Sequence, residues 1–284
     1  MTYLRDFLGA FRIRDWLITL LMIPVLGAYI SASSPLNIAF IAASFFFVCC
    51  YGFLLNDYFD IEIDQRNRKK VKDGTNAILS GKLPGNISVL LTAVFASLGF
   101  LIASLIGSQT LMLTLACMLL LFAYSAKPFR LKDVPGLDIL VHGGTYLLAF
   151  LSGYSAGGLA LLPTAIFPAT MIFLLGQAIL VCHQLIDYEE DKKSANTTIT
   201  RLGLKNGWNL LLAYTALIAL SNEFLVGYLA LSPILHLVGA GYACFFLFWG
   251  LRADYAKASG RETLIRDRFY ILNNLSLIAL AIAL

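Results

Sequence analysis

Two clusters of acidic residues carry the side chains of this chain that are best suited to chemistry. Each cluster comes directly after a long apolar run, and each is followed by basic residues. Carboxylates are costly next to hydrocarbon, so a protein that keeps several of them there usually binds something with them. The first cluster consists of Asn56, Asp57, Asp60 and Asp64, and the second of Asp187 and Asp191.

The spacing of the first cluster places its carboxylates on one face of a helix. If the apolar helix continues through residue 64, each residue advances by about 100° around the axis. Asp57, Asp60 and Asp64 then lie within about 100° of Asn56, whereas Glu62 points away. Three carboxylates on one stripe repel one another strongly unless a cation lies between them.

The second cluster shows the same order. Asp191 lies about 40° from Asp187, and His183 and Gln184 share that face, whereas the neighbouring glutamates at 189 and 190 leave it. Mg²⁺ is a hard cation that prefers carboxylate and phosphate oxygens. Two such stripes therefore predict Mg²⁺ ions that bridge to a diphosphate. The alternative for either cluster alone is a solvated helix end with scattered acids.

A diphosphate also needs cations and hydrogen-bond donors, and residues 124–132 supply them. Lys127 offers a point charge, Arg130 a guanidinium that can bind two phosphate oxygens, and Tyr124 a phenolic donor. Each of these residues alone is more readily explained by membrane topology. Together with the acidic clusters, they predict an anion site.

The composition is that of an integral membrane protein. Of the 284 residues, 59% are hydrophobic and 13% charged, against about 25% charged residues in a soluble domain. A spanning helix needs about 20 mostly apolar residues. The chain offers about nine such segments in one all-α bundle, a single domain over residues 1–284. They are 15–31, 36–56, 87–107, 109–125, 136–156, 163–187, 207–229, 231–251 and 267–284.

Basic residues predict the orientation of this bundle. All 21 Lys and Arg residues lie before the first segment or in alternate loops, and the opposite loops carry none. Loops rich in Lys and Arg stay in the cytoplasm. The N-terminus and the acidic clusters are therefore expected on the cytoplasmic face, in the inner membrane if the source is bacterial.

The motifs resemble those of the UbiA superfamily of intramembrane prenyltransferases. Residues 56–64 match every fixed position of its NDxxDxxxD motif, Asp187 and Asp191 match its DxxxD motif, and residues 124–132 resemble its YSxxPxRxK segment. The likeness extends over nearly the whole chain. It implies nine helices with a cytoplasmic cap over the active site.

The resemblance also implies the roles of these residues. Asp60, Asp64, Asp187 and Asp191 would be the catalytic residues and would hold Mg²⁺, with help from Asp57. A second group would contact the diphosphate: Asn56, Asp57, Tyr124, Lys127, Arg130 and Arg66. His183 is a candidate to orient the acceptor or to act as a base.

One position departs from the family pattern. Many members carry an Arg-Pro pair before the Ile-x-Ser-Gly stretch, and that arginine touches phosphate, whereas this chain has Asn76-Ala77. Arg66, Arg68 and Lys72 are candidates to replace it. The run of residues 67–70, Asn-Arg-Lys-Lys, is similar to the carotenoid-elongating branch of the family.

The expected function is transfer of a prenyl group from an allylic diphosphate to a hydrophobic acceptor, first of all an aromatic ring. The alternatives are a carotenoid (lycopene-type) elongase, a membrane terpene cyclase and, outside enzymes, an ion or phosphate transporter. The expected partners are the isoprenoid diphosphate, the acceptor and the lipid bilayer. Nothing in the sequence indicates a nucleic acid or an obligatory protein partner.

Overall fold

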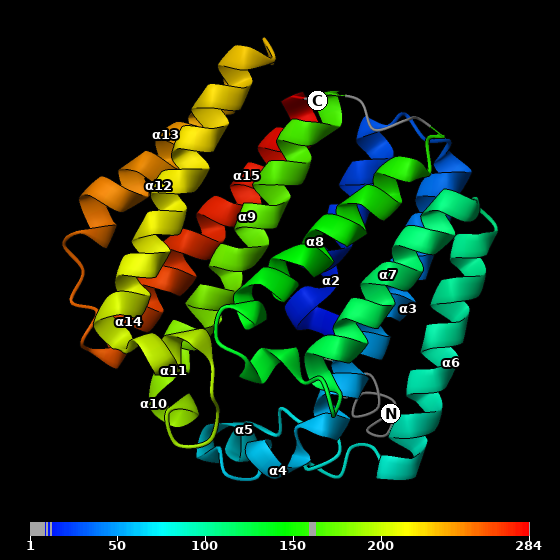
Figure 1. Ribbon diagram of the computed structural model, residues 1–284, viewed down its shortest axis with the longest axis vertical. Helices are drawn as coiled ribbons and strands as arrows, with labels where there is room; N and C mark the ends of the chain where they lie inside the picture. Colours follow the sequence, from blue (N-terminus) through cyan, green and yellow to red (C-terminus); the bar gives the residue numbers. More distant parts are fainter. Residues whose placement is uncertain (1–8, 10, 12, 159–162, 284) are drawn as a thin grey trace. The chain divides into compact units, whose positions relative to one another are not determined.

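The chain folds into helices. The computed structural model describes residues 9, 11, 13–158 and 163–283, and this part of the chain contains helices and no strand (Figure 1). Arg5 and Arg12, which count toward the predicted orientation, lie outside the described residues. The predicted all-helical fold is therefore confirmed for the described residues.

Six described helical segments are long and apolar enough to cross a membrane. They are α3 (Pro35–Phe59), α6 (Gly85–Ser104), α7 (Ser108–Ser125), Ala165–Ile186 of α9 (Pro163–Ile186), α12 (Leu204–Tyr228) and the segment Pro233–Gly250. The other predicted spans coincide with α2 (Ile13–Ile30), α8 (Leu137–Ser155) and α15 (Tyr270–Ala283). The count of nine spans stays a prediction.

The chain divides into two compact units. Unit 1 comprises residues 1–133, 148–158 and 193–195, and unit 2 comprises residues 134–147, 159–192 and 196–284. Helix α8 belongs to unit 2 at its start and to unit 1 at its end. The first acidic cluster lies in unit 1 and the second in unit 2.

Unit 1 holds its helices together through small and polar residues. An added Cβ at Gly153 of α8 would lie 1.8 Å from the Pro24 carbonyl oxygen of α2, so only glycine permits this approach. Ser44 of α3 donates a hydrogen bond to the Gly99 carbonyl of α6 at 2.8 Å. Close backbones and interhelical hydrogen bonds are the usual means of packing helices in lipid.

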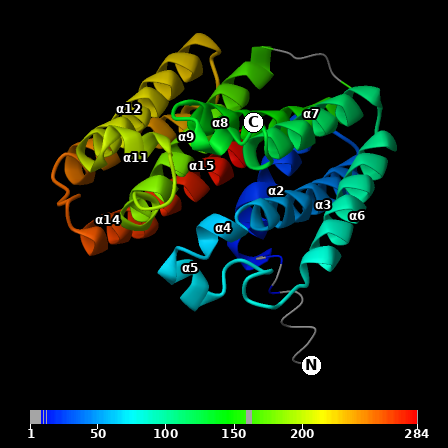
Figure 2. The ribbon, with the colours of Figure 1, turned by 60° about the horizontal axis from the view of Figure 1, so that its bottom comes forward.

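A short excursion connects α3 to α6 in unit 1. It contains α4 (Ile61–Asp64), α5 (Arg68–Asp73) and a loop over residues 74–84, and it leaves the end of α3 (Figure 2). Ala77 and Leu83 of the loop are buried in a cluster with Leu54 of α3. The excursion is thus packed onto the helix end that carries the first acidic cluster. Its role as a cytoplasmic cap stays a prediction.

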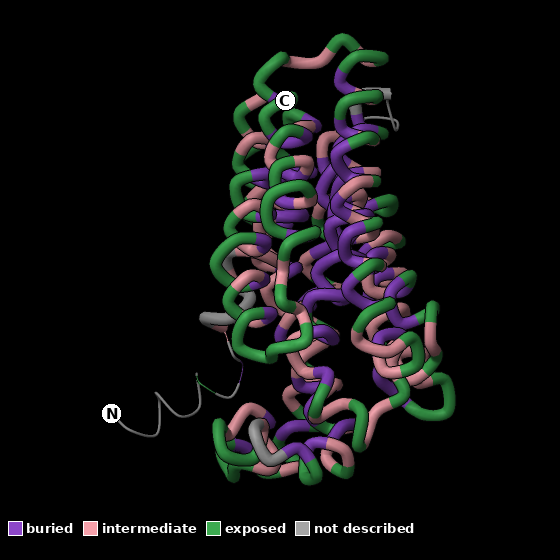
Figure 3. Tube along the Cα trace, turned by 90° about the vertical axis from the view of Figure 1, so that its left-hand side faces the viewer, coloured by how far each residue is buried: buried purple, intermediate pink, exposed green. Residues whose placement is uncertain are grey.

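Unit 2 is built around α9. Of the candidate spans, the α9 segment Ala165–Ile186 is the most deeply buried. Figure 3 shows buried, intermediate and exposed residues along the Cα trace of the chain. α10 (Tyr188–Asp191) and α11 (Thr198–Leu202) follow it and lead to α12.

Two π-helices interrupt the last part of unit 2. After η2 (Pro233–Leu235) and α13 (His236–Cys244), the first of them is η3 (Phe245–Gly250). After α14 (Ala258–Leu264), the second is η4 (Ile265–Phe269), which leads into α15. Such π-turns are rare and are often found at functional sites.

Candidate active site

Asp60 lies at a break between two helices. α3 ends at Phe59, Asp60 has φ −98° and ψ 1°, and α4 begins at the next residue. The expectation of a continuous helix through residue 64 was therefore wrong. The Ile63 amide bonds to the Asp60 carbonyl at 3.0 Å, and the Asp64 amide bonds to the same carbonyl at 2.8 Å. The near-helical spacing survives the break, so Asp57, Asp60 and Asp64 are buried while Glu62 is exposed.

Arg130 stabilises this break. Its Nη1 donates to the Phe59 carbonyl at 3.0 Å, and its Nη2 donates to Asp60 Oδ1 at 2.8 Å. The Nε donates to Asp133 Oδ2 at 2.6 Å. Arg130 has φ 40°, a conformation that costs a residue other than glycine about 1–3 kcal/mol. The guanidinium is therefore held in place by the surrounding contacts.

A second cation binds the same carboxylate. Lys132, in η1 (Leu131–Asp133), donates to Asp60 Oδ1 at 2.6 Å and to Asn56 Oδ1 at 2.7 Å. Burial by itself raises the pKa of Asp60, but the charges and hydrogen bonds of Lys132 and Arg130 outweigh it and hold the pKa of that carboxyl below its usual value. Asp60 is therefore ionised at neutral pH despite its burial.

Asp64 and Asp57 are held by the excursion. Lys70 of α5 forms an ion pair with Asp64 at 2.8 Å. The Asn76 amide nitrogen donates to Asp64 Oδ2 at 3.0 Å and to the Asp57 carbonyl at 2.8 Å. Asp57 Oδ2 accepts a hydrogen bond from the Ala77 amide at 2.8 Å. The Asp57 carboxylate thus binds the loop over residues 74–84, and Asn76 joins this loop to Asp57 and Asp64.

The other predicted diphosphate contacts of unit 1 differ in exposure. Tyr124 is half-buried, and Arg66 is exposed. Lys127 is exposed and lies 3.7 Å from Glu62, the acid that leaves the common face. The structure thus brings Arg130 and Asn56 to Asp60, and places Lys127 beside a different carboxylate.

The second cluster repeats the backbone geometry of the first. α9 ends at Ile186, Asp187 has φ −91° and ψ 7°, and α10 begins at the next residue. The Asp191 amide bonds to the Asp187 carbonyl at 2.9 Å, so the two carboxylates lie one turn apart. Both are half-buried. This φ,ψ region is sparsely populated and is frequent among active-site residues.

A buried carboxylate outside both motifs supports the second cluster. Asp138 of α8 is fully buried and accepts hydrogen bonds from Gln184 Nε2 at 2.8 Å and from the Thr198 amide at 2.7 Å. Gln184 Oε1 in turn accepts from the Ile199 amide at 3.1 Å. Gln184, one turn before Asp187, therefore binds structural partners and joins α9 to α11.

His183 contacts a residue of the last helix. The Tyr270 hydroxyl lies 3.2 Å from His183 Nδ1, with the ring centroids 5.7 Å apart. Tyr270 follows the π-helix η4 directly. His183 lies one turn before Asp187 along α9, and the Tyr270 hydroxyl reaches it from α15.

The donor chemistry of both clusters suits Mg²⁺. Among the described residues, no three His, Cys, Asp or Glu side chains come close enough together to hold a metal ion by themselves. Asp60 and Asp64 nevertheless offer the carboxylate oxygens that a hard cation takes, and both of Asp60's cationic partners bind its Oδ1. Mg²⁺ characteristically uses one or two carboxylates together with waters and substrate phosphates.

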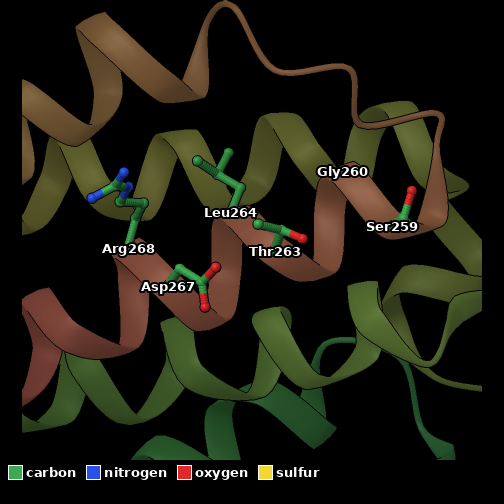
Figure 4. A pocket seen from close by; sticks show the side chains of 6 residues that line it. All are labelled: Ser259, Gly260, Thr263, Leu264, Asp267 and Arg268. Carbon is green, nitrogen blue, oxygen red and sulfur yellow. The ribbon is translucent and has the colours of Figure 1, made fainter.

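A hollow elsewhere in unit 2 contains none of the predicted site residues. It has a volume of about 370 Å³ and lies along α14 and η4 (Figure 4). Its charged residues, Asp267 and Arg268, have opposite signs, and Arg268 also lies over the Trp249 ring at 5.5 Å. This lining does not favour a diphosphate.

Three residues of the site region were missed as such by sequence reasoning. Lys132 was noticed only as part of a basic segment, although a cation two residues after Arg130 is a usable signal. Asn76 was noticed only as the position at which the family arginine is missing. Asp138 gave a signal of its own, because an acid in the first turn of a predicted membrane helix is costly unless it is satisfied.

Residues 16–273 match the sequence profile of the UbiA prenyltransferase family, and the chain belongs to this family. It is therefore an enzyme of the prenyltransferase class, as its acidic motifs predicted.

Individual relatives differ in the acceptor that their names imply. The chain is 26% identical over 277 residues to digeranylgeranylglyceryl phosphate synthase of Methanocaldococcus jannaschii, covering 93% of this chain and 89% of that protein. It is 34% identical over 161 residues to lycopene elongase/hydratase of Haloarcula japonica, covering 56% of this chain and 51% of that protein.

The fold is shared with a solved structure. A UbiA homologue from Archaeoglobus fulgidus, determined with GPP and Mg²⁺, superposes with a TM-score of 0.79 at 21% identity, over 97% of this chain and 98% of that one. At this identity the likeness establishes the fold.

Proposed function

We propose that this prenyltransferase uses Mg²⁺ to transfer a prenyl group from an allylic diphosphate to a hydrophobic acceptor. The observation that carries the proposal is the arrangement at Asp60. A buried, ionised carboxylate at a helix end has a guanidinium at 2.8 Å and an ammonium at 2.6 Å. Such an arrangement suits a ligand that brings both a divalent cation and phosphate oxygens.

Asp60, Asp64, Asp187 and Asp191 would hold the metal. Mg²⁺ would neutralise charge on the diphosphate as its bond to the prenyl carbon breaks, which lowers the barrier to ionisation. Asp60 and Asp187, which directly precede α4 and α10, have nearly the same backbone conformation. Both motifs thus present two carboxylates one turn apart, which supports equivalent roles.

Arg130, Lys132 and Asn56 would bind the diphosphate. Arg130 is oriented by Asp133 and by the Phe59 carbonyl, so its guanidinium is positioned before the substrate arrives. Preorganised contacts stabilise the ionising transition state more than the ground state. Tyr124, Lys127 and Arg66 remain candidates for further contacts at the rim of this site.

The acceptor atom is proposed to be an electron-rich carbon, and an aromatic ring is the first candidate. His183 and Tyr270 would orient it by hydrogen bonding, because His183 lies one turn before Asp187 and Tyr270 contacts His183. Elongation of a carotenoid-type polyene is the second candidate. It is favoured by the 34% identity to the lycopene elongase/hydratase and by the basic run of residues 67–70.

The test is release of diphosphate by the purified protein in detergent with Mg²⁺ and labelled dimethylallyl, geranyl or geranylgeranyl diphosphate. Asp60→Asn and Asp187→Asn should lower the rate by at least about 10²–10³-fold, the usual effect of one preorganised electrostatic contact. If the wild type neither binds nor turns over any of these diphosphates, the proposal is wrong.

The same assay distinguishes the acceptors. A hydroxybenzoate, a polyene hydrocarbon and a glycerol phosphate ether are offered in parallel, and prenylated products are separated. Diphosphate release with a cyclic hydrocarbon product and no acceptor consumption would identify a terpene cyclase instead.

A further inference from the structure

The last turn of α9, which leads into Asp187, is held by a buried arginine from the last part of the chain. Arg261 of α14 is 1% exposed. Its Nε donates to the Leu185 carbonyl at 2.6 Å, and its Nη1 donates to the Tyr255 carbonyl at 2.6 Å. The guanidinium therefore joins the last turn of α9 to the segment that precedes α14.

This arrangement parallels the one at the first motif. In unit 1, Arg130 binds the carbonyl of Phe59, the residue before Asp60. In unit 2, Arg261 binds the carbonyl of Leu185, two residues before Asp187. At both breaks the carbonyl of the aspartate accepts a hydrogen bond from the amide three residues later. Ile63 donates to Asp60 and Glu190 donates to Asp187, each at 3.0 Å. The last carbonyls of a helix have no intrahelical partner, and a cation is a favourable partner for them.

Arg261 differs from Arg130 in the partner of its third guanidinium nitrogen, Nη2. Arg130 binds its own motif carboxylate through Nη2, whereas the Nη2 of Arg261 is buried and makes no hydrogen bond with the described residues. The guanidinium thus binds the backbone just before the second motif. Keeping a charge buried with one donor unsatisfied costs free energy.

The segment that Arg261 binds through Tyr255 packs against α12. Tyr255, whose carbonyl it binds, stacks on Trp208 of α12 with ring centroids 6.0 Å apart. Trp208 is buried, and its Nε1 donates to the Gly250 carbonyl at 3.0 Å. The residue whose carbonyl binds Arg261 Nη1 is therefore itself held by packing on α12.

We propose that Arg261 is a positioning residue of the reaction, which sets the backbone of α9 so that Asp187 presents its carboxylate to Mg²⁺. This assignment rests on the proposed function. Residues that orient a metal ligand typically contribute about 10–100-fold to metal affinity or activity. Arg261 lies 70 residues beyond the second motif in the chain and belongs to neither motif.

The experiment compares the full-length protein with Arg261→Met, Arg261→Gln and Arg261→Lys. Mg²⁺ dependence is measured by diphosphate release from geranyl diphosphate, and metal binding is measured separately with Mn²⁺ by electron paramagnetic resonance. Arg261→Met should raise the half-saturating Mg²⁺ concentration and the Mn²⁺ dissociation constant by about 10-fold or more. Arg261→Gln and Arg261→Lys each keep a donor for the Leu185 carbonyl and should recover part of this loss.

Arg268→Met is the matched control. It lies two turns further along the same helical segment, is exposed, and contacts the Trp249 ring. Its metal dependence should equal that of the wild type. Thermal unfolding of every variant shows which of them are folded, and Arg261→Lys replaces Arg261→Met if the latter does not fold.

Two results overturn the assignment. A folded Arg261→Met with wild-type Mg²⁺ and Mn²⁺ dependence shows that the contact does not position Asp187. A lower unfolding temperature with unchanged metal dependence shows that the role is structural only. If the wild type itself binds neither Mn²⁺ nor geranyl diphosphate, the proposed function fails first, and the assignment with it.

Discussion

At the scale of single residues, Asp60 owes its state to two cations that the chain brings from residues 130 and 132. Lys132 lies 2.6 Å from Asp60 and 2.7 Å from Asn56, whereas Lys127 lies near Glu62. Sequence reasoning selected Lys127 and Arg130 as diphosphate contacts. The geometry makes Lys132 the stronger candidate of the two lysines, because it shares a carboxylate with Arg130.

Replacement of Lys132 tests this choice. Lys132→Met should lower kcat/KM for the allylic diphosphate by about 10²-fold, because it removes a preorganised positive charge beside the site. Lys257→Met is the control, since Lys257 is exposed and pairs with the exposed Asp254, at 2.9 Å. A larger loss from Lys127→Met than from Lys132→Met would show that the sequence-based choice was right.

At the scale of elements, two short segments tie the motifs to their surroundings. The loop over residues 74–84 is fastened to α3 and α4 by Asn76, and α11 is fastened to α8 and α9 by Asp138. Both residues are buried, and their polar side-chain atoms form hydrogen bonds with other groups of the protein. Asn76 stands where many family members have an arginine, but it carries no charge and so does not replace that cation.

Loss of the Asn76 side chain should loosen the excursion. Its Oδ1 accepts hydrogen bonds from the Ile78 and Leu79 amides at 3.0 and 3.2 Å, and its Nδ2 makes two more contacts. Asn76→Ala should lower the free energy of unfolding by about 2–3 kcal/mol, because several buried groups lose their partners. Thermal unfolding in detergent measures this, and exposed Ser80→Ala in the same loop should unfold like the wild type.

The effect of Asp138→Ala should be larger. Besides Gln184 and Thr198, its carboxylate accepts from the Gly136 and Ile139 amides at 3.0 and 2.8 Å. Removing this carboxylate takes the shared acceptor away from the buried residues Gln184, Thr198 and Ile139, so we expect a loss of more than about 3 kcal/mol. Asp254→Ala, at an exposed position, is the control. An unfolding transition of Asp138→Ala equal to that of the wild type would contradict the structural role.

At the scale of the whole molecule, the distribution of charge predicts how the chain lies in the membrane. All 21 Lys and Arg residues occur before the first predicted span or in alternate loops, so both motifs are expected in the cytoplasm. The six candidate spans establish a membrane protein. Which face is cytoplasmic is open to a direct measurement.

Thiol labelling in intact cells tests the orientation across α6. Cys244 is exposed and is first replaced by alanine. In that background, a reagent that does not cross membranes should label Ser108→Cys in intact cells and Lys72→Cys only after permeabilisation. Both positions are exposed and lie on either side of α6. The reverse pattern would contradict the predicted orientation.

The amino-acid sequence by itself determined the class of fold, the family and the residues of the two motifs. Apolar length predicts membrane helices because lipid leaves few alternatives, and N-D-x-x-D-x-x-x-D with D-x-x-x-D is specific in residue type and spacing. The helix breaks at Asp60, but the Asp64 amide still bonds to the Asp60 carbonyl, and Asp57, Asp60 and Asp64 are buried while Glu62 is exposed.

Only the tertiary structure decided which distant side chains support these motifs. Lys132, Asn76, Asp138 and Arg261 reach the motif regions from 12 to 76 residues away in the chain. Their contacts depend on where loops return and on which backbone carbonyls a helix break releases. A periodic pattern in one helix contains no information about either, so these contacts can be read only from the folded chain.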